Sequence, residues 1–406
     1  MPDNTNPAIG GRTDPVGELN RRHLLKRSFL AGGAWFMGLD KLAGQPFFQT
    51  SVRGLLERGQ LLGTIPFTGE ARVPMEDAFG AELDGRLYTD LAALNPDSSV
   101  IPTERFYIRT RASELLEAQK IWQVRVGGLT ARPYQLTMED LKGMAKPMGR
   151  HLMECAGNAR SVHFGMIGVA DWGGVPLFDI LDGAKANPRG NRVVISGFDT
   201  YVRKSASSVP GASWVFTKEE LKNAGAFLAT EMNGSPLTKD HGAPVRLIVP
   251  GWYGCACIKW VNEITFTEDA VEATSQMQEY AARTMQEGVP RMAREYKPAI
   301  IEQAAMPIRV EKWISSEKTL YRIDGILWGG SAPVKKLQIR FNPEEDYVDV
   351  HELEQKSNDP WSFWSHTWEP QRQGSYLIRL RVAAPTVIAR RLDAGYYMRS
   401  VDIAEV

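Results

Sequence analysis

The chain contains very little cysteine, with three residues in 406, at positions 155, 255 and 257. So few cysteines exclude a disulfide framework, and Cys255 and Cys257 are too close in sequence for an unstrained bridge. The pair also lacks the partner ligands of a structural zinc site. No Cys-x-x-Cys-His stretch is present, which excludes a covalently attached haem. Each cysteine therefore has to be considered singly, as a buried residue or a reactive thiol.

The chain also lacks an excess of either charge, because 48 Lys and Arg balance 48 Asp and Glu. There is thus no overall field that would attract nucleic acid or a membrane surface. Beyond the first 44 residues no stretch offers eighteen uncharged apolar residues, so no membrane span is expected in the mature chain. A hydrophobic content of 43% and a charged content of 24% are ordinary for globular domains, and the length predicts two or three of them.

The first 44 residues read as a separate segment. Residues 1–19 are polar and rich in Gly, Pro and Asn, which predicts disorder. Arg21 and Arg22 then precede an apolar run, Ser28 to Leu39, that is too short to cross a bilayer. This pattern is typical of a twin-arginine export signal and predicts a periplasmic protein; the alternative is a basic amphipathic helix.

In the rest of the sequence, the pattern of apolar and polar residues changes near residue 300. We expect residues 45–100 to be an irregular lead-in and residues 105–109 to form a strand that ends in a cation. Thr137 before acidic residues predicts the start of a short helix, and Asn233-Gly234 predicts a hairpin. From Met306 onward, alternating strands recur at spacings typical of a β-sandwich. Three tryptophans there are expected to fill a core or an interface, namely Trp361, Trp364 and Trp368.

The segment His151 to Arg160 holds the most informative cysteine. Cys155 is followed by Ala156 and Gly157, which let the backbone approach closely, and by Asn158, which can fix the loop through side-chain hydrogen bonds. Arg160 adds a permanent cation suited to an oxyanion. A soft thiolate beside such a cation indicates metal-assisted chemistry on an oxyanion. The alternative is a buried structural cysteine, which is the commoner role of an arbitrary lone cysteine.

Glu-Cys-Ala-Gly-Asn-x-Arg resembles the molybdenum-cysteine loop of the sulfite oxidase family, and the resemblance covers roughly residues 100–400. Further family-like pieces follow in the family's order: Phe106 to Arg109, Trp172 to Leu177, Glu231 to Gly234 with Pro236-Leu237, His241 to Arg246, Val249 to Gly251, and Ile258 to Trp260. The resemblance implies an α+β fold: a mixed α+β molybdopterin-binding domain over residues 45–300, then an all-β immunoglobulin-like sandwich over 301–406, which often makes a homodimer.

The same resemblance implies roles for individual residues. Cys155 would ligate molybdenum, which carries a single molybdopterin. Arg109, Arg160 and Tyr280 would bind the substrate oxyanion. The residues implied to hold the cofactor are Arg109, Asp199, His241, Arg246, Cys257, Ile258 and Lys259. A phosphate does favour Arg, Lys and backbone N–H groups, and a pterin amine edge favours a carboxylate. Without the family context His241 could be a loop histidine, Asp199 a turn cap and Tyr280 a packing residue.

Two departures from the family pattern affect the expected substrate. Thr110-Arg111 stands where familiar members have Asn-His, so a cofactor-binding histidine is replaced by a cation. Ala159-Arg160 stands where members often have paired arginines.

The expected function is oxidation of sulfite to sulfate, with electrons passing to a separate carrier such as a c-type cytochrome. One alternative is a reductase of the same fold acting on an S- or N-oxide, although two desolvated arginines without a counter-charge would disfavour a neutral oxide. Another is a secreted binding protein without cofactor.

Overall fold

The computed structural model describes one compact unit within Gly59–Val406. The predicted export signal, Arg111 and Asp199 lie outside the described residues. The described ranges are 59–70, 87–110, 116, 121–198, 212–315, 318–354, 359–383 and 386–406.

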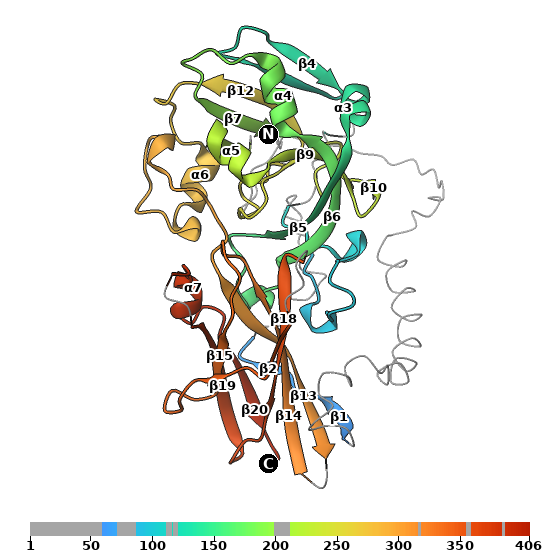
Figure 1. The fold of residues 1–406 in the computed structure, drawn as a ribbon, viewed down its shortest axis with the longest axis vertical. Helices are drawn as coiled ribbons and strands as arrows, with labels where there is room; N and C mark the ends of the chain where they lie inside the picture. Colours follow the sequence, from blue (N-terminus) through green and yellow to red (C-terminus); the bar gives the residue numbers. More distant parts are fainter. Residues whose placement is uncertain are drawn as a thin grey trace, which may run out of the picture. The chain divides into compact units, whose positions relative to one another are not determined.

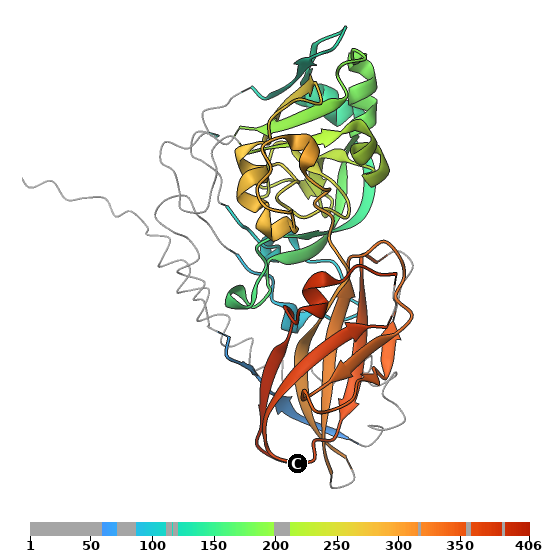
Figure 2. The same ribbon diagram turned by 90° about the vertical axis from the view of Figure 1, so that its left-hand side faces the viewer.

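Strands dominate the part of the chain that the structure describes (Figures 1 and 2). Four five-stranded sheets are present there, and the longest helix, α4, has only 8 residues. The expected α+β class is therefore corrected to a mostly β fold with few short helices. Among these residues no helix is long and apolar enough to cross a membrane.

One sheet, in the order β10-β9-β6-β5 with β11 beside β9, leads directly into the cysteine loop. β5 and β6 are antiparallel, and Glu154 at the end of β5 lies opposite Ile167. Asn233 and Gly234 join β9 to β10 with φ angles of 53° and 74°, which confirms the predicted hairpin. The bounds are β5 Lys146–Glu154, β6 Ile167–Pro176, β9 Phe227–Met232, β10 Ser235–Pro236 and β11 Arg246–Ile248.

A second sheet, in the order β4-β3-β12-β7-β8, has one parallel pair, β3 with β12. The predicted helix start is confirmed, because Thr137 and Asp140 cap each other's backbone N–H at the beginning of α3. The strands are β3 Gln123–Gly128, β4 Tyr134–Thr137, β7 Arg192–Gly197, β8 Ser213–Thr217 and β12 Val261–Thr267; the helices are α3 Met138–Met144, α4 Leu177–Ala184, α5 Lys218–Ala224 and α6 Ser275–Tyr280.

Two further sheets contain all the strands after residue 303, in the orders β1-β13-β14-β18-β17 and β16-β15-β19-β20-β2. Aromatic rings connect them, since Trp368 on β18 lies 4.6 Å from Tyr376 on β19, measured between ring centroids. The immunoglobulin-like sandwich and the boundary near residue 300 stay predictions. The bounds are β13 Ala304–Ser315, β14 Lys318–Trp328, β15 Leu337–Arg340, β16 Val348–Asp349, β17 Glu352–Glu354, β18 Trp361–Trp368, β19 Gly374–Val382, β20 Arg399–Ile403 and α7 Arg390–Asp393.

Two local expectations were wrong. The lead-in is not wholly irregular, because β1 Gln60–Thr64 pairs with β13 and β2 Phe67–Thr68 pairs with β20. Residues 105–109 form no strand, and only Ile108 makes a bridge, to Leu87. The sequence pattern is not that of a half-buried strand, because the consecutive Phe106 and Tyr107 are both buried. In a half-buried strand, buried and exposed side chains alternate.

Candidate active site

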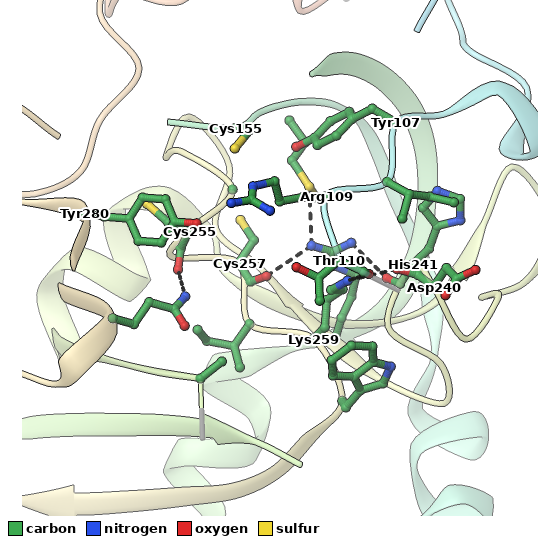
Figure 3. A pocket seen from close by; sticks show the side chains of 18 of the residues that line it. Tyr107, Arg109, Thr110, Cys155, Asp240, His241, Cys255, Cys257, Lys259 and Tyr280 are labelled. Carbon is green, nitrogen blue, oxygen red and sulfur yellow. Dashed lines mark hydrogen bonds between the residues drawn. The ribbon is translucent and has the colours of Figure 1, made fainter. Parts of the chain in front are cut away.

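A pocket of roughly 830 Å³, counting its open mouth, collects side chains from five segments of the chain (Figure 3). They are residues 106–110, the end of β5 with Cys155, residues 240–246, residues 254–260, and α6; Ala212 also lines the pocket. All three cysteines line it. In the view of Figure 3, Cys155 and Tyr280 lie toward one end, and His241 and Lys259 toward the other.

Cys155 is held in a tight turn at the end of β5. Its N–H donates to the carbonyl of Met166 at 2.9 Å, and its own carbonyl accepts the N–H of Asn158 at 2.9 Å. The N–H of Gly157 lies 3.4 Å from Sγ of Cys155. This backbone N–H is directed at the sulfur, and a cysteine sulfur binds metal as the thiolate.

Glu154 precedes Cys155 and is completely buried. Its carboxylate accepts hydrogen bonds from Trp328 Nε1 at 2.8 Å, Asn158 Nδ2 at 3.3 Å and the Tyr397 hydroxyl at 3.4 Å. Burial raises the pKa of the Glu154 carboxyl, and these donors together with Arg391 oppose that increase.

Two cations at the far end of the pocket are held by backbone carbonyls. Buried Arg246 donates to the carbonyls of His241 at 2.8 Å and Cys257 at 3.1 Å. Lys259 donates to the carbonyls of Thr110 at 2.6 Å and Asp240 at 3.0 Å. Both positive charges are thereby fixed in place beside the cavity.

Gly242 makes this arrangement possible. Its φ of +108° is a conformation that other residues rarely adopt. A Cβ atom there would lie only 3.0 Å from Arg246 Cβ and 3.1 Å from Lys259 Cβ. The glycine therefore leaves the space in which the side chains of Arg246 and Lys259 begin.

His241 is neutral at pH 7, because burial, helped by Arg246 and Lys259, lowers its pKa to about 4. Its Nε2 lies 3.2 Å from the carbonyl of Phe106, and its Nδ1 lies 2.7 Å from the hydroxyl of Thr238. A carbonyl can only accept, so Nε2 carries the proton and Nδ1 accepts from Thr238.

Two tyrosines supply neutral hydroxyl groups to the pocket. Tyr280, the last residue of α6, is buried, and burial together with Cys155 raises the pKa of its phenol. Burial likewise raises the pKa of the Tyr107 phenol. Both remain hydrogen-bond donors at physiological pH.

The structure brings most of the sequence-predicted site residues together. Arg160 is not among the residues that line the pocket, and its guanidinium donates to the carbonyl of Met398 at 2.5 Å. Asp199 lies outside the described residues. The predicted residues found around the pocket are Arg109, Cys155, His241, Arg246, Cys257, Ile258, Lys259 and Tyr280.

Two further arginines approach the cysteine loop and were not anticipated. Arg391 donates to the carbonyl of Ala156 at 3.0 Å and also to the carbonyl of Arg283. Arg283 Nη1 would lie 3.5 Å from a Cβ atom on Gly157. No local pattern marks either residue, because each is brought to the loop only by the folding of distant parts of the chain.

These residues fit a molybdenum–molybdopterin cofactor. Cys155 offers a soft ligand for the metal. Among the described residues, the Nε of Arg246 is a buried donor without a hydrogen-bond partner, and such a donor at a pocket wall suits a phosphate oxygen. Lys259 adds a second fixed cation beside it.

A model of the oxidoreductase molybdopterin-binding domain matches residues 112–275. Sulfite oxidase of Arabidopsis thaliana is 27% identical over 203 residues, covering 45% of this chain and 51% of the plant protein. Sulfite oxidase of Gallus gallus is 27% identical over 53% of this chain and 50% of its own. NADPH nitrate reductase of Fusarium oxysporum is 29% identical over 36% of this chain and 17% of its own. The chain thus spans about half or less of each of these relatives.

The fold is similar to that of the sulfane dehydrogenase SoxCD of Paracoccus pantotrophus, with a TM-score of 0.59 and 20% identity, covering 79% of this chain and 81% of that one. At this identity the likeness concerns the fold alone. The domain match, the sulfite oxidase relatives and the cysteine-centred pocket lead to one conclusion: the chain belongs to the sulfite oxidase family of molybdopterin-dependent oxidoreductases.

Proposed function

We propose that the protein oxidises sulfite to sulfate and passes the electrons to a separate one-electron carrier such as a c-type cytochrome. The observation that carries this proposal is the juxtaposition, in one pocket, of Cys155 with the cation Arg109 and the neutral donor Tyr280. Sulfite is a small oxyanion, and such a pocket suits it better than a neutral oxide.

The cofactor would be one molybdopterin with molybdenum bound to Cys155. When bound, it supplies the two-electron oxidation and the oxygen transferred to sulfur. Arg246 and Lys259 would hold the phosphate, because both present positive charge fixed by backbone carbonyls. His241 and the backbone at Cys257 and Ile258 would hold the rest of the group.

The substrate would be bound by side chains near Cys155. Arg109 would compensate the charge of the oxyanion and orient it, and Tyr280 would donate a hydrogen bond to an oxygen. Arg391, fixed at the carbonyl of Ala156, adds permanent positive charge at the loop. A substrate role for Arg160 stays a prediction, since its guanidinium is engaged by Met398.

A second candidate is reduction of an oxyanion. The relatives also include an NADPH nitrate reductase that is 29% identical over 161 residues, and nitrate would suit a cationic pocket as sulfite does. Reduction of an S- or N-oxide by the same fold stays a further alternative.

Further proposals concern the whole protein. We propose that it is exported by the twin-arginine route to the periplasm, that residues 301–406 form an immunoglobulin-like domain that makes a homodimer, and that it binds no nucleic acid.

Metal analysis and two assays test the proposed function. Purified protein should contain about one molybdenum per chain and reduce ferricytochrome c or ferricyanide when sulfite is added. Cys155→Ser should fold, yet lose turnover. Full sulfite oxidation by this variant would contradict the proposed role of Cys155 as the metal ligand. Nitrate-dependent oxidation of reduced viologen, without any sulfite activity, would favour the second candidate.

A further inference from the structure

The cysteine loop is held from outside by residues of β14, of α7 and of the segment that follows α7. Four hydrogen bonds reach residues 154–158 from there. Trp328 and Tyr397 donate to the Glu154 carboxylate at 2.8 Å and 3.4 Å. The others run from Arg391 to the carbonyl of Ala156 at 3.0 Å and from the Tyr396 hydroxyl to the carbonyl of Asn158 at 2.6 Å.

Glu154 is the centre of this network. A fully buried carboxylate is unfavourable unless its oxygens are paired. Here Oε2 accepts from Trp328, while Oε1 accepts from Asn158 and Tyr397. The acceptors of this one side chain therefore link the loop to two separate parts of the C-terminal region.

The network extends to both sides of Cys155. Asn158, which donates to Glu154, uses its Oδ1 to accept the N–H of Met166 at 3.0 Å. The carbonyl of the same Met166 accepts the N–H of Cys155 at 2.9 Å. Gly157 has no side chain and Ala156 offers only a methyl group, so this turn relies on hydrogen bonds for its position.

We infer that Glu154 is a positioning residue that sets the Cys155 sulfur through Asn158, and that Trp328 on β14 and Tyr397 after α7 thereby make the C-terminal region a structural part of the cysteine site. This inference rests on the proposed function only in taking Cys155 as the metal ligand. It gives residues 301–406 a role in the site that is separate from dimer formation.

A matched pair of tryptophan variants tests the inference. Trp328→Phe removes the donor to Glu154 and keeps most of the ring. Trp364→Phe is the control, because Trp364 is equally buried, lies on neighbouring β18 and donates to the carbonyl of Ile326 at 3.1 Å, away from the loop. Loss of groups that orient a metal ligand typically lowers metal affinity or activity about 10- to 100-fold.

Three quantities are measured on both variants and the parent: molybdenum per chain, the thiolate-to-metal absorption band of the oxidised protein, and the melting temperature. We expect both variants to lose melting temperature, and only Trp328→Phe to shift the band and to lose metal or turnover. A Trp328→Phe protein with the parent's band, metal content and turnover would overturn the inference.

A second readout follows the Cys155 sulfur itself and not the spectrum or content of the metal. Iodoacetamide labelling of Cys155 in the full chain, followed by peptide mass spectrometry, should be several-fold faster in Tyr397→Phe than in Tyr376→Phe. Tyr376 is the control because its hydroxyl donates to the carbonyl of Arg372, away from the loop. Equal labelling rates would count against the positioning role. If the parent contained no molybdenum, the proposed function would fail, while this comparison would still decide the inference.

Discussion

At the residue scale, burial decides which titratable side chains of the pocket are charged and which are neutral. The pKa of His241 falls to about 4, so this side chain is an uncharged hydrogen-bonding group at pH 7. Burial raises the pKa of Tyr280, which therefore keeps its proton. Burial also lowers the pKa of Arg246, but a guanidinium starts so high that its charge persists. Positive charge in the pocket thus comes from arginine and lysine.

The positions of two arginines predict different effects on sulfite oxidation. Arg109 lines the pocket, whereas Arg160 is engaged by the carbonyl of Met398. A lost charge-assisted hydrogen bond costs about 1.5–3 kcal/mol, so Arg109→Gln should lower kcat/KM for sulfite roughly 10- to 100-fold, mainly through KM. Arg160→Gln should change kcat/KM much less and should lower the melting temperature instead. Steady-state kinetics and thermal unfolding of both variants decide between them; a larger kinetic loss in Arg160→Gln would reverse the assignment.

The charge of the substrate gives a second prediction. If Arg109 binds an oxyanion, sulfate should compete with sulfite, and rising ionic strength should weaken sulfite binding because salt screens the attraction. Initial rates at several sulfate concentrations, with chloride at equal ionic strength as the control, measure this. Absence of competition beyond the chloride effect would contradict an oxyanion pocket.

At the element scale, the two C-terminal sheets meet through aromatic and histidine side chains. Phe341 stacks on Trp368 at a centroid distance of 4.0 Å, and the ring of His366 on β18 lies 4.1 Å from that of His351. Burial, together with His351, lowers the pKa of His366 to about 4. This strand therefore carries a histidine that is neutral when folded.

That histidine predicts a loss of stability in acid. Below about pH 6.5 the unfolded chain binds a proton at His366 that the folded chain does not bind until about pH 4. The free energy of unfolding should therefore fall as the pH falls through this window, by up to about 3 kcal/mol from this residue. His366→Phe should reduce the fall between pH 7 and pH 4.5, measured by urea unfolding, while His351→Phe should change it less. An unaltered pH dependence in His366→Phe would contradict the burial argument.

At the scale of the whole molecule, the N-terminal and C-terminal parts of the described chain complete each other's sheets. β1 and β2 are edge strands beside β13 and β20, although more than 230 residues separate the paired segments. The C-terminal region in turn holds the cysteine loop through Trp328 and Arg391. The site therefore depends on residues from before and after position 300, whether or not a domain boundary lies there.

Export is a further prediction at this scale. Arg21 and Arg22 precede the short apolar run, so replacing both with lysine should leave cofactor-loaded protein in the cytoplasm. Cell fractionation followed by molybdenum analysis of each fraction measures the effect. Arg27→Lys, a nearby change outside the pair, is the control and should leave export intact. Unchanged periplasmic protein after the double change would refute the twin-arginine route.

The sequence by itself determined the features that depend on neighbours in the chain. The cap at Thr137 and the turn at Asn233-Gly234 form because each is satisfied within a few residues. The motif around Cys155, together with the pieces that follow it in order, also identified most of the pocket residues.

Only the tertiary structure decided which cations reach the cysteine loop and what fixes it. Arg391 and Arg283 approach the loop, Arg160 donates to the carbonyl of Met398, and Trp328 donates to Glu154. None of these contacts follows a local period or motif, because each joins residues that the folded sheets bring together from distant parts of the chain. The hydrogen-bond donors of a buried carboxylate such as Glu154 are the ones that the packing of the folded chain places beside it. The order of residues along the sequence does not give the positions of these donors in space.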